Sequence, residues 1–466
     1  MQRLGADYYE NLAVIDRVLR MGESFDVLKK KLILPDGELT LYFIDGFAKD
    51  TVLQKLMMNF SSVKKMPTSA ERFMEQYLPY VETDVTASVE SMIHTVMSGG
   101  TLMLGTGFGA EAILIDTRTY PARDTEEPEG DRVMRGSRDG FVETLIFNTA
   151  LIRRRIRNPA LTMEYFKIGR DSQSDVVLCY MSDRADRSYV KSLQRKLRSV
   201  DTDALIMGHE SLKECLIRQR WYNPFPKVRT TERPDSAASQ LLEGSVLILV
   251  DNSPQVMVLP STIFDFMQES NDFYFPPLTA TYIKLLRYSV FFITLVLTPS
   301  WFLALLYPEA VPTWLAFIIP EERGVLPIMV QLLLAEFIID ALRLASLNTP
   351  NMLNNSLSVV GGLILGDFAV EIGWLIPEVI LYMAFAAIAN FTQRSYELGY
   401  AIKFLRILLL VLTGFFGIWG YAGGLVVIVV LLLTNTTLNG KRNYMYPLIP
   451  FNGKALRTLL FRVRKR

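Results

Sequence analysis

The chain has 466 residues, of which 50% are hydrophobic and 21% are charged, and its formal net charge is +1. A charge so near zero excludes a basic protein that coats nucleic acid, and the length exceeds what one compact core usually holds. Two histidines, His94 and His209, and two cysteines, Cys179 and Cys215, offer little material for a triad, a zinc site or a disulfide framework. We therefore expect no enzyme, no cofactor and no metal, and two thiols that are buried or inert.

A recurring order of elements marks the first 270 residues. The stretches that begin at Leu39 and Val176 both indicate a strand, a turn with aspartate and an amphipathic helix. The stretches that begin at Ser88 and Arg233 both indicate a helix, a glycine and two strands. This recurrence predicts an α/β cytosolic domain that arose by duplication.

The predicted domain divides into two similar subdomains, residues 31–145 and 146–270, linked by a helix that begins near Phe141. Residues 1–30 precede them as a separate helical segment. This segment carries charge throughout and lacks the apolar stretch of a signal peptide, so we expect it to stay in the cytosol.

Two features of this domain are candidate binding sites. The glycines of GTGFGA, from Gly105, lie between two predicted strands without the lysine of a phosphate loop, so they are predicted to form a structural turn. The linking helix is basic, and guanidinium groups suit carboxylates and phosphates, so it is a candidate subunit interface or head-group site, with a solvated helix face as the alternative. These residues are Arg153, Arg154, Arg155 and Arg157.

Long apolar runs with few charges dominate residues 280–440 and predict a helical polytopic membrane domain. Residues 285–307 and 325–347 are each long enough for one span. The run 356–391 is broken near Gly373 and Pro377, which favours a re-entrant or tilted hairpin. The run 404–434, bent at Gly420 to Gly424, indicates a further hairpin.

The basic residues beside these runs fall on one face of the predicted threading, and the positive-inside rule makes that face cytosolic. They are Lys284, Arg287, Arg343, Arg394, Lys403, Arg406, Lys441 and Arg442. Both termini are then cytosolic, with four or six spans. The basic tail, residues 441–466, is expected to lie against anionic lipid.

Charged residues within the apolar runs suggest function, because a carboxylate at bilayer depth must face protein or water. Glu336, Asp340 and Arg343 are predicted to form an intramembrane charge network, with a purely structural pair as the alternative. The segment from Ser356 to Glu371 combines small residues with two acids, and we expect it to line an ion pathway whose acids lie near a cytosolic mouth. The alternative is a cytosolic or interfacial location in which these two acids have no special role. The predicted pore-lining residues are Ser358, Gly362, Gly366, Asp367 and Glu371.

Several sequence blocks resemble the GerA family of spore germination A-subunits. They are RGSRDGFVETLIFNTALIRRRIRNP from Arg135, NPFPKVRTTERPD from Asn223, SVVGGLILGDFAVEIGWLIPEVILYMAFAAIANFT from Ser358, and YPLIPFNGKAL from Tyr446. The resemblance extends over nearly all of the chain beyond about residue 35. Asn348-Thr349-Pro350 stands where typical A-subunits carry Arg-Leu-Pro, and this and other blocks resemble the stage V sporulation protein AF branch.

The resemblance implies a multi-pass protein of the inner spore membrane that takes part in germination. It further implies a homo-oligomer, with a pentamer expected, that passes monovalent cations and works with another spore membrane protein or with germinant receptor subunits. The departure from Arg-Leu-Pro puts nutrient gating in doubt. The favoured function is the pore-forming subunit of a cation channel, and a scaffold or a transporter-like subunit without its own pore is the alternative.

Overall fold

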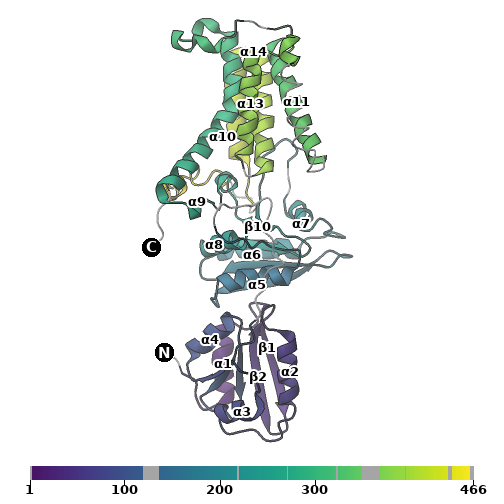
Figure 1. The fold of residues 1–466 in the computed structure, drawn as a ribbon, viewed down its shortest axis with the longest axis vertical. Helices are drawn as coiled ribbons and strands as arrows, with labels where there is room; N and C mark the ends of the chain where they lie inside the picture. The colour runs from purple at the N-terminus through teal and green to yellow at the C-terminus, as the bar shows by residue number, and fades with distance from the viewer. Residues whose placement is uncertain are drawn as a thin grey trace. The chain divides into compact units, whose positions relative to one another are not determined.

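The computed structural model describes residues 3–118, 136–217, 220–269, 271–321, 324–348, 368–393, 395–438 and 443–461. The chain forms two compact units (Figure 1). The N-terminal unit comprises residues 1–218 and 228–260, and the helical unit comprises residues 219–227 and 261–466. Residues 219–227 thus interrupt the sequence of the N-terminal unit and belong to the helical unit.

The N-terminal unit consists of two repeats with the same order of nine elements. The first contains α1 (Tyr8–Leu19), β1 (Val27–Leu34), β2 (Gly37–Ile44), α2 (Asp50–Phe60), α3 (Ala70–Tyr77), β3 (Thr83–Thr86), α4 (Val89–Met97), β4 (Thr101–Gly105) and β5 (Ala112–Ile115). The second contains α5 (Leu145–Arg155), β6 (Leu161–Ile168), β7 (Ser174–Met181), α6 (Arg187–Arg198), α7 (His209–Leu216), β8 (Arg229–Thr231), α8 (Pro234–Leu242), β9 (Val246–Val250) and β10 (Val256–Leu259). The predicted duplication is confirmed.

Each repeat builds one five-stranded antiparallel sheet, and the two sheets have equivalent strand orders: β1-β2-β4-β5-β3 and β6-β7-β9-β10-β8. The β1–β2 hairpin runs from Val27 opposite Ile44 to Leu34 opposite Gly37. The glycines after β4 form the predicted turn to β5. Gly107 is needed there because a Cβ at this position would meet the carbonyl oxygen of Pro67.

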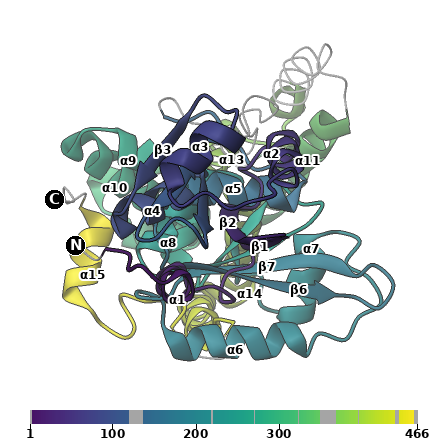
Figure 2. The same cartoon turned by 90° about the horizontal axis from the view of Figure 1, so that it is seen from below.

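Helices cover both faces of the first sheet. Because alternate residues of a strand point to opposite faces, Tyr42 and Ile44 pack against α1 and α4, whereas Leu39 and Leu41 pack against α2 and α3. In the second repeat, α5 and α8 pack on one face around Cys179. Figure 2 shows α6 running alongside β6.

The repeat begins earlier than predicted, which corrects two domain assignments. Residues 1–30 are not a separate segment: α1 buries Ile15 and Leu19 in the core of the first repeat, and β1 already begins at Val27. The predicted linking helix is α5, and it occupies the same place in the second repeat as α1 in the first. Both helices need the sheet to cover their apolar face, so each belongs to its repeat.

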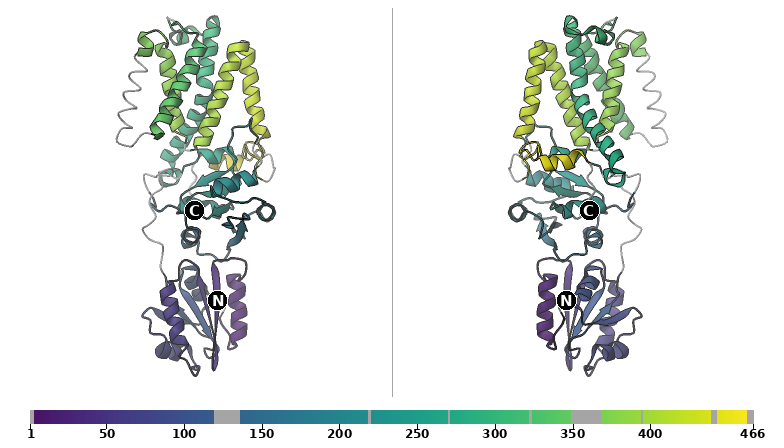
Figure 3. Two further views of the ribbon diagram at one scale, coloured as in Figure 1. Left: turned by 90° about the vertical axis from the view of Figure 1, so that its right-hand side faces the viewer. Right: turned by 90° about the vertical axis from the view of Figure 1, so that its left-hand side faces the viewer.

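The helical unit begins at Ser261 rather than after residue 270. Its elements are η1 (Ile263–Met267), α9 (Asn271–Tyr274), α10 (Pro277–Leu306), η2 (Pro308–Ala310), η3 (Thr313–Ile318), α11 (Ile328–Asn348), α13 (Pro377–Phe391), α14 (Tyr396–Thr434) and α15 (Gly453–Leu460). By length and composition, α10 and α14 are able to cross a membrane. α10 packs against both α13 and α14, and α11 packs against α13 (Figure 3).

α14 is a helical hairpin rather than one straight helix of 39 residues. Gly417 interrupts it with φ 56° and ψ −134°, a backbone conformation that favours glycine. A Cβ on Gly424 would lie 2.6 Å from Leu409 Cδ1, although 15 residues would span about 22 Å in a straight helix. The hairpin is therefore observed, but its turn lies at Gly417, and Gly420 and Gly424 allow the second arm (418–434) to pack closely on the first (396–416).

Candidate functional site

Four charged side chains meet inside the helical unit. Arg406 of α14 donates to Glu336 Oε1 of α11 through Nε at 2.8 Å and also through Nη2. Lys403 Nζ lies 3.8 Å from Glu336 Oε2 and also pairs with Asp340. A further bond, from Arg406 Nη1 to the carbonyl oxygen of Thr294 at 3.3 Å, ties α10 to this charge cluster.

The burial of these four side chains indicates whether the charge cluster has a structural role. The side chains of Arg406, Lys403 and Glu336 are only 5%, 7% and 8% exposed, whereas Asp340 is 41% exposed. A buried charge is tolerated only when it is paired and hydrogen-bonded, and here two acids balance two bases. The cluster therefore fixes α11 to α14 and contributes no net charge.

Arg343, one turn beyond Asp340, is surrounded by aromatic rings. Its guanidinium carbon lies 5.0 Å from the ring centre of Phe391, 5.3 Å from that of Tyr396 and 5.5 Å from that of Tyr400. A cation this close to ring faces is attracted by their quadrupoles. Arg343 thus fixes the last turns of α11 to the junction of α13 and α14.

The structure brings together the three predicted network residues along one helix, but with different partners from those expected. The ion-pair partners of Glu336 are Arg406 and Lys403 of α14. The sequence predicts Lys403 and Arg406 on the cytosolic flank, yet they lie within the bundle at 5% and 4% exposure. The sequence contains a signal for this pairing. The bases Lys403 and Arg406 are spaced i, i+3 and the acids Glu336 and Asp340 are spaced i, i+4, so each pair lies on one face of its own helix.

Four of the five predicted pore-lining residues, Ser358, Gly362, Gly366 and Asp367, lie outside the described residues. The fifth, Glu371, is exposed and follows Phe368 in a short helical turn. The predicted chain break is observed beyond it, where Gly373 has φ 76° and Pro377 begins α13. No ion pair of Glu371 occurs within the part of the chain that the structure describes.

The prediction that Glu371 lies near a cytosolic mouth conflicts with the prediction that Arg343 lies on the cytosolic face. Gly373, two residues later, accepts a hydrogen bond from the backbone of Val325 at 3.0 Å, and Val325 precedes the first residue of α11. Arg343, which the threading placed on the cytosolic face, lies near the opposite end of α11. Glu371 is therefore at the end of the bundle that carries the α10–α11 loop, opposite the end with the clustered bases.

Arg153, a predicted subunit-interface residue, is fully buried between the two repeats. Its Nε donates to Asp26 Oδ2 at 2.8 Å and its Nη2 to Asp26 Oδ1 at 3.0 Å, and further bonds reach Ser24 and two carbonyl oxygens. With 0% of the residue exposed, its guanidinium is fully engaged within the chain. We name Arg153, Asp26 and Ser24 the repeat junction.

The other predicted interface arginines lie nearer the surface. Arg155 pairs with Asp139 at 2.6 Å. Burial alone would raise the pKa of Asp139, but hydrogen bonds from Arg155 and Ser137 lower it below the ordinary value. Arg154 is exposed on α5, and Arg157, which is exposed beyond the end of α5, donates to Ser98 Oγ at 3.4 Å.

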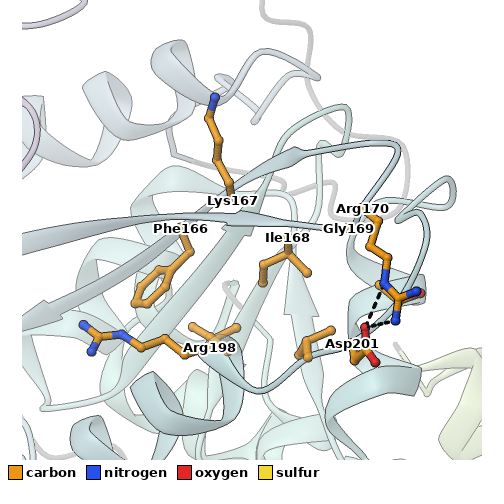
Figure 4. A pocket seen from close by; sticks show the side chains of 10 residues that line it. Phe166, Lys167, Ile168, Gly169, Arg170, Arg198 and Asp201 are labelled. Carbon is orange, nitrogen blue, oxygen red and sulfur yellow. Dashed lines mark hydrogen bonds and ion pairs between the residues drawn. The ribbon is translucent and has the colours of Figure 1, made fainter.

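A surface hollow of about 370 Å³ lies between the β6–β7 turn and the end of α6 (Figure 4). The side chain of Lys167 points away from it, on the opposite side of the strand from Phe166 and Ile168. Arg170 at its rim bonds to Asp201 at 2.6 Å, and both side chains are more than two-thirds exposed. Exposed ion pairs of this kind contribute roughly 0–1 kcal/mol to stability. The pair at the rim therefore does not supply the buried, fixed polar groups that a ligand site needs.

The sequence also contains an anchor that residue patterns did not reveal. Phe225 is 1% exposed in the core of the helical unit, and Tyr444 donates its hydroxyl to the carbonyl oxygen of Pro226 at 2.8 Å. Asn223 donates to the carbonyl oxygen of Leu431 near the end of α14 at 3.3 Å. In the sequence, the only indication of this anchor is that Phe225 lies between two prolines. The fold is needed to show that Phe225 belongs to the core of the helical unit.

Comparisons with known proteins place the chain among germination proteins. A sequence model of the family described as Bacillus/Clostridium GerA spore germination protein matches residues 17–466. Stage V sporulation protein AF of Bacillus subtilis (strain 168) is 37% identical over 96% of this chain and 90% of its own length. Spore germination protein KA of the same organism is 29% identical over 95% of this chain and 82% of its own length.

A solved structure is also similar. The N-terminal domain of the A subunit of the Bacillus megaterium spore germinant receptor GerK3 is 24% identical, with a TM-score of 0.43, and the match covers 56% of this chain and 98% of that one. The resemblance to the GerA family and to its stage V sporulation protein AF branch is confirmed by the family match and the 37% identity. The chain therefore belongs to the GerA family of spore germination proteins and is a membrane protein of that family.

Proposed function

We propose that this chain is the pore-forming subunit of a homo-oligomeric cation channel that releases monovalent cations during germination. One observation carries the proposal. Glu336 and Asp340 are paired with Arg406 and Lys403, whereas Glu371 is exposed and is not part of the charge cluster. The protein thus separates acids that stabilise the fold from an acid that remains available to an ion.

The chemistry of a carboxylate ring supports this role. In a symmetric oligomer each Glu371 is repeated around the axis, so the local concentration of cations rises and anions are repelled. The segment that precedes Glu371 in sequence carries the small residues Ser358, Gly362 and Gly366. Small side chains of this kind leave room for hydrated ions where several copies converge.

Ion flux through reconstituted protein tests the proposal. Glu371→Gln, alone and with Asp367→Asn, should reduce cation flux and cation-over-anion selectivity in liposomes, and Gly362→Trp should block conduction. Glu309→Gln is the matched control, because it removes an exposed acid from the α10–α11 loop. Unchanged flux and selectivity in the Glu371 variants, with unimpaired conduction in Gly362→Trp, would exclude this pathway.

The alternative is a scaffold or a transporter-like subunit without its own pore. The charge cluster favours it, because full internal pairing of Glu336 and Asp340 is what a packing bundle requires. The stoichiometry of the purified protein in detergent separates the two functions. A ring supports a central pore, whereas a monomer or a dimer supports the alternative.

The remaining parts of the proposal concern location and partners. We place the protein in the inner spore membrane with both termini in the cytosol, as a pentamer that works with another spore membrane protein or with germinant receptor subunits. The basic tail, residues 441–466, adds attraction to anionic lipid of roughly 1 kcal/mol per nearby base. Catalysis and cofactor binding are not part of this proposed function.

A further inference from the structure

A loop of the helical unit displays two aromatic side chains. Trp221 is 95% exposed and Tyr222 is 48% exposed. Two residues later the chain is fixed, because Asn223 is 5% exposed, donates to the carbonyl oxygen of Leu431 at 3.3 Å and accepts from the backbone of Phe225 at 3.1 Å. The exposure of Trp221 therefore belongs to an anchored loop next to buried residues.

The loop also carries a cation beside its aromatic rings. Arg220 Nη1 donates to the hydroxyl oxygen of Tyr222 at 2.9 Å, and its guanidinium carbon lies 5.9 Å from the centre of the Tyr222 ring. The rings of Trp221 and Tyr222 stand edge to face, with centres 6.0 Å apart. The three side chains thus form one exposed group, which we name the aromatic loop.

The position of the aromatic loop in the helical unit indicates what it meets. The second arm of α14 exposes an apolar stripe that consists of Val426, Val427, Val429, Val430 and Leu433. Leu431, to which Asn223 is bonded, lies near the end of this arm. In a membrane protein such a stripe faces lipid tails, and tryptophan and tyrosine are enriched where the apolar surface meets the head groups. The aromatic loop lies beside the end of this arm, to which Asn223 is hydrogen-bonded.

We propose that the aromatic loop docks onto an anionic lipid surface beside the end of α14, with Trp221 at head-group depth and Arg220 bound to lipid phosphate. The guanidinium fork matches phosphate oxygens, and the indole combines a large apolar area with one polar N–H group. The loop would then hold the end of the α14 hairpin at the membrane surface. This role is independent of the proposed pore, since a scaffold would use it equally.

Tryptophan fluorescence of the full chain in liposomes tests this docking. The emission of Trp221 is obtained by subtracting the spectrum of Trp221→Phe from that of the wild type. Because Trp221 is exposed, this substitution should leave folding intact. Liposomes of phosphatidylcholine and phosphatidylglycerol, with bromine near the head group or near the chain end, act as quenchers. Loss of most of the Trp221 emission with the shallow bromine, and much less with the deep one, is the expected result.

Two comparisons sharpen the test. The matched control is Trp301→Phe: Trp301 is 3% exposed inside the bundle, so its emission should lose far less to the shallow bromine. Arg220→Gln should weaken the quenching of Trp221 in phosphatidylglycerol more than in pure phosphatidylcholine. Quenching by aqueous acrylamide without quenching by lipid would overturn the proposal in favour of a loop in water, and quenching by neither would assign the loop to a protein partner such as a second copy of this chain.

Discussion

Arg153 shows how one residue can fix the arrangement of two repeats. It belongs to the second repeat, whereas Asp26 and Ser24 belong to the first, and all three are buried. Ser24 Oγ also accepts the backbone N–H of Met163 at 3.0 Å, so the first repeat satisfies a donor of edge strand β6. The repeat junction therefore combines an ion pair with protection of an exposed sheet edge.

Loss of this guanidinium should be costly. Arg153→Met leaves Asp26 buried without its partner, which typically destabilises a protein by about 3–5 kcal/mol. We expect a lower denaturation midpoint for the N-terminal unit of the full chain in detergent, measured by circular dichroism. Arg154→Met, an exposed neighbour on α5, should change stability by no more than about 0.5 kcal/mol. The double variant Asp26→Leu/Arg153→Met should recover part of the loss, and equal effects of the two single variants would contradict the assignment.

The two cysteines provide a second test at the residue scale. Cys179 is fully buried in β7, and burial raises the pKa of its thiol far above the ordinary value, whereas Cys215 is exposed on α7. A maleimide at neutral pH should label one thiol per chain before denaturation and two afterwards, as measured by mass spectrometry, because only a thiolate reacts. Cys215→Ser should abolish the labelling of the native protein. Rapid labelling of Cys179 in the native state would show that the second repeat opens readily.

The equivalence of α1 and α5 is the main lesson at the scale of elements. The strand and helix patterns revealed the duplication but not that α1 belongs to its first copy. α1 is amphipathic, and its partner surface consists of residues from α4 and β4 far along the sequence. Assignment of such a helix to a domain therefore requires its tertiary contacts.

Close packing of the α14 hairpin yields a prediction with an internal control. A Cβ on Gly420 would meet the carbonyl oxygen of Leu412, whereas a Cβ on Gly423 would meet no atom within 4 Å. Gly420→Ala should therefore destabilise the helical unit by about 1–3 kcal/mol through overpacking. Gly423→Ala should be neutral or slightly stabilising, because alanine favours helix. Thermal unfolding in detergent compares the two, and equal melting temperatures would contradict the hairpin geometry.

At the scale of the whole molecule, the path of the chain predicts which sites share a side of the membrane. α10 has 30 residues and is therefore about 45 Å long, enough to cross a bilayer. Glu309 follows its last residue, whereas α15, which carries Lys454, follows the end of the α14 hairpin. Cysteines placed at Glu309 and Lys454 in a Cys215→Ser background should be labelled from opposite sides of sealed vesicles. Labelling of both from the same side would refute the threading.

Sequence periodicity and charge by themselves determined much of the architecture. They predicted two similar subdomains, a membrane domain, the break at Gly373 and Pro377, and a hairpin near Gly420, because these features depend on local patterns of apolar residues, glycine and proline. They also identified Glu336, Asp340 and Arg343 as charges of interest within apolar runs. The local sequence pattern is sufficient to predict a helix, a strand or a break, because each of these depends on which face of a single element is apolar.

Only the tertiary structure decided which charges meet. The partners of Glu336 lie about 70 positions later, and Asp26 meets Arg153 across the boundary between two repeats. The sequence lists acids and bases without the distances between them, and the electrostatic energy of a pair depends on that distance and on the exclusion of water. For the same reason the location of Glu371 at the α10–α11 end followed from a hydrogen bond between Val325 and Gly373, which no count of basic residues could supply.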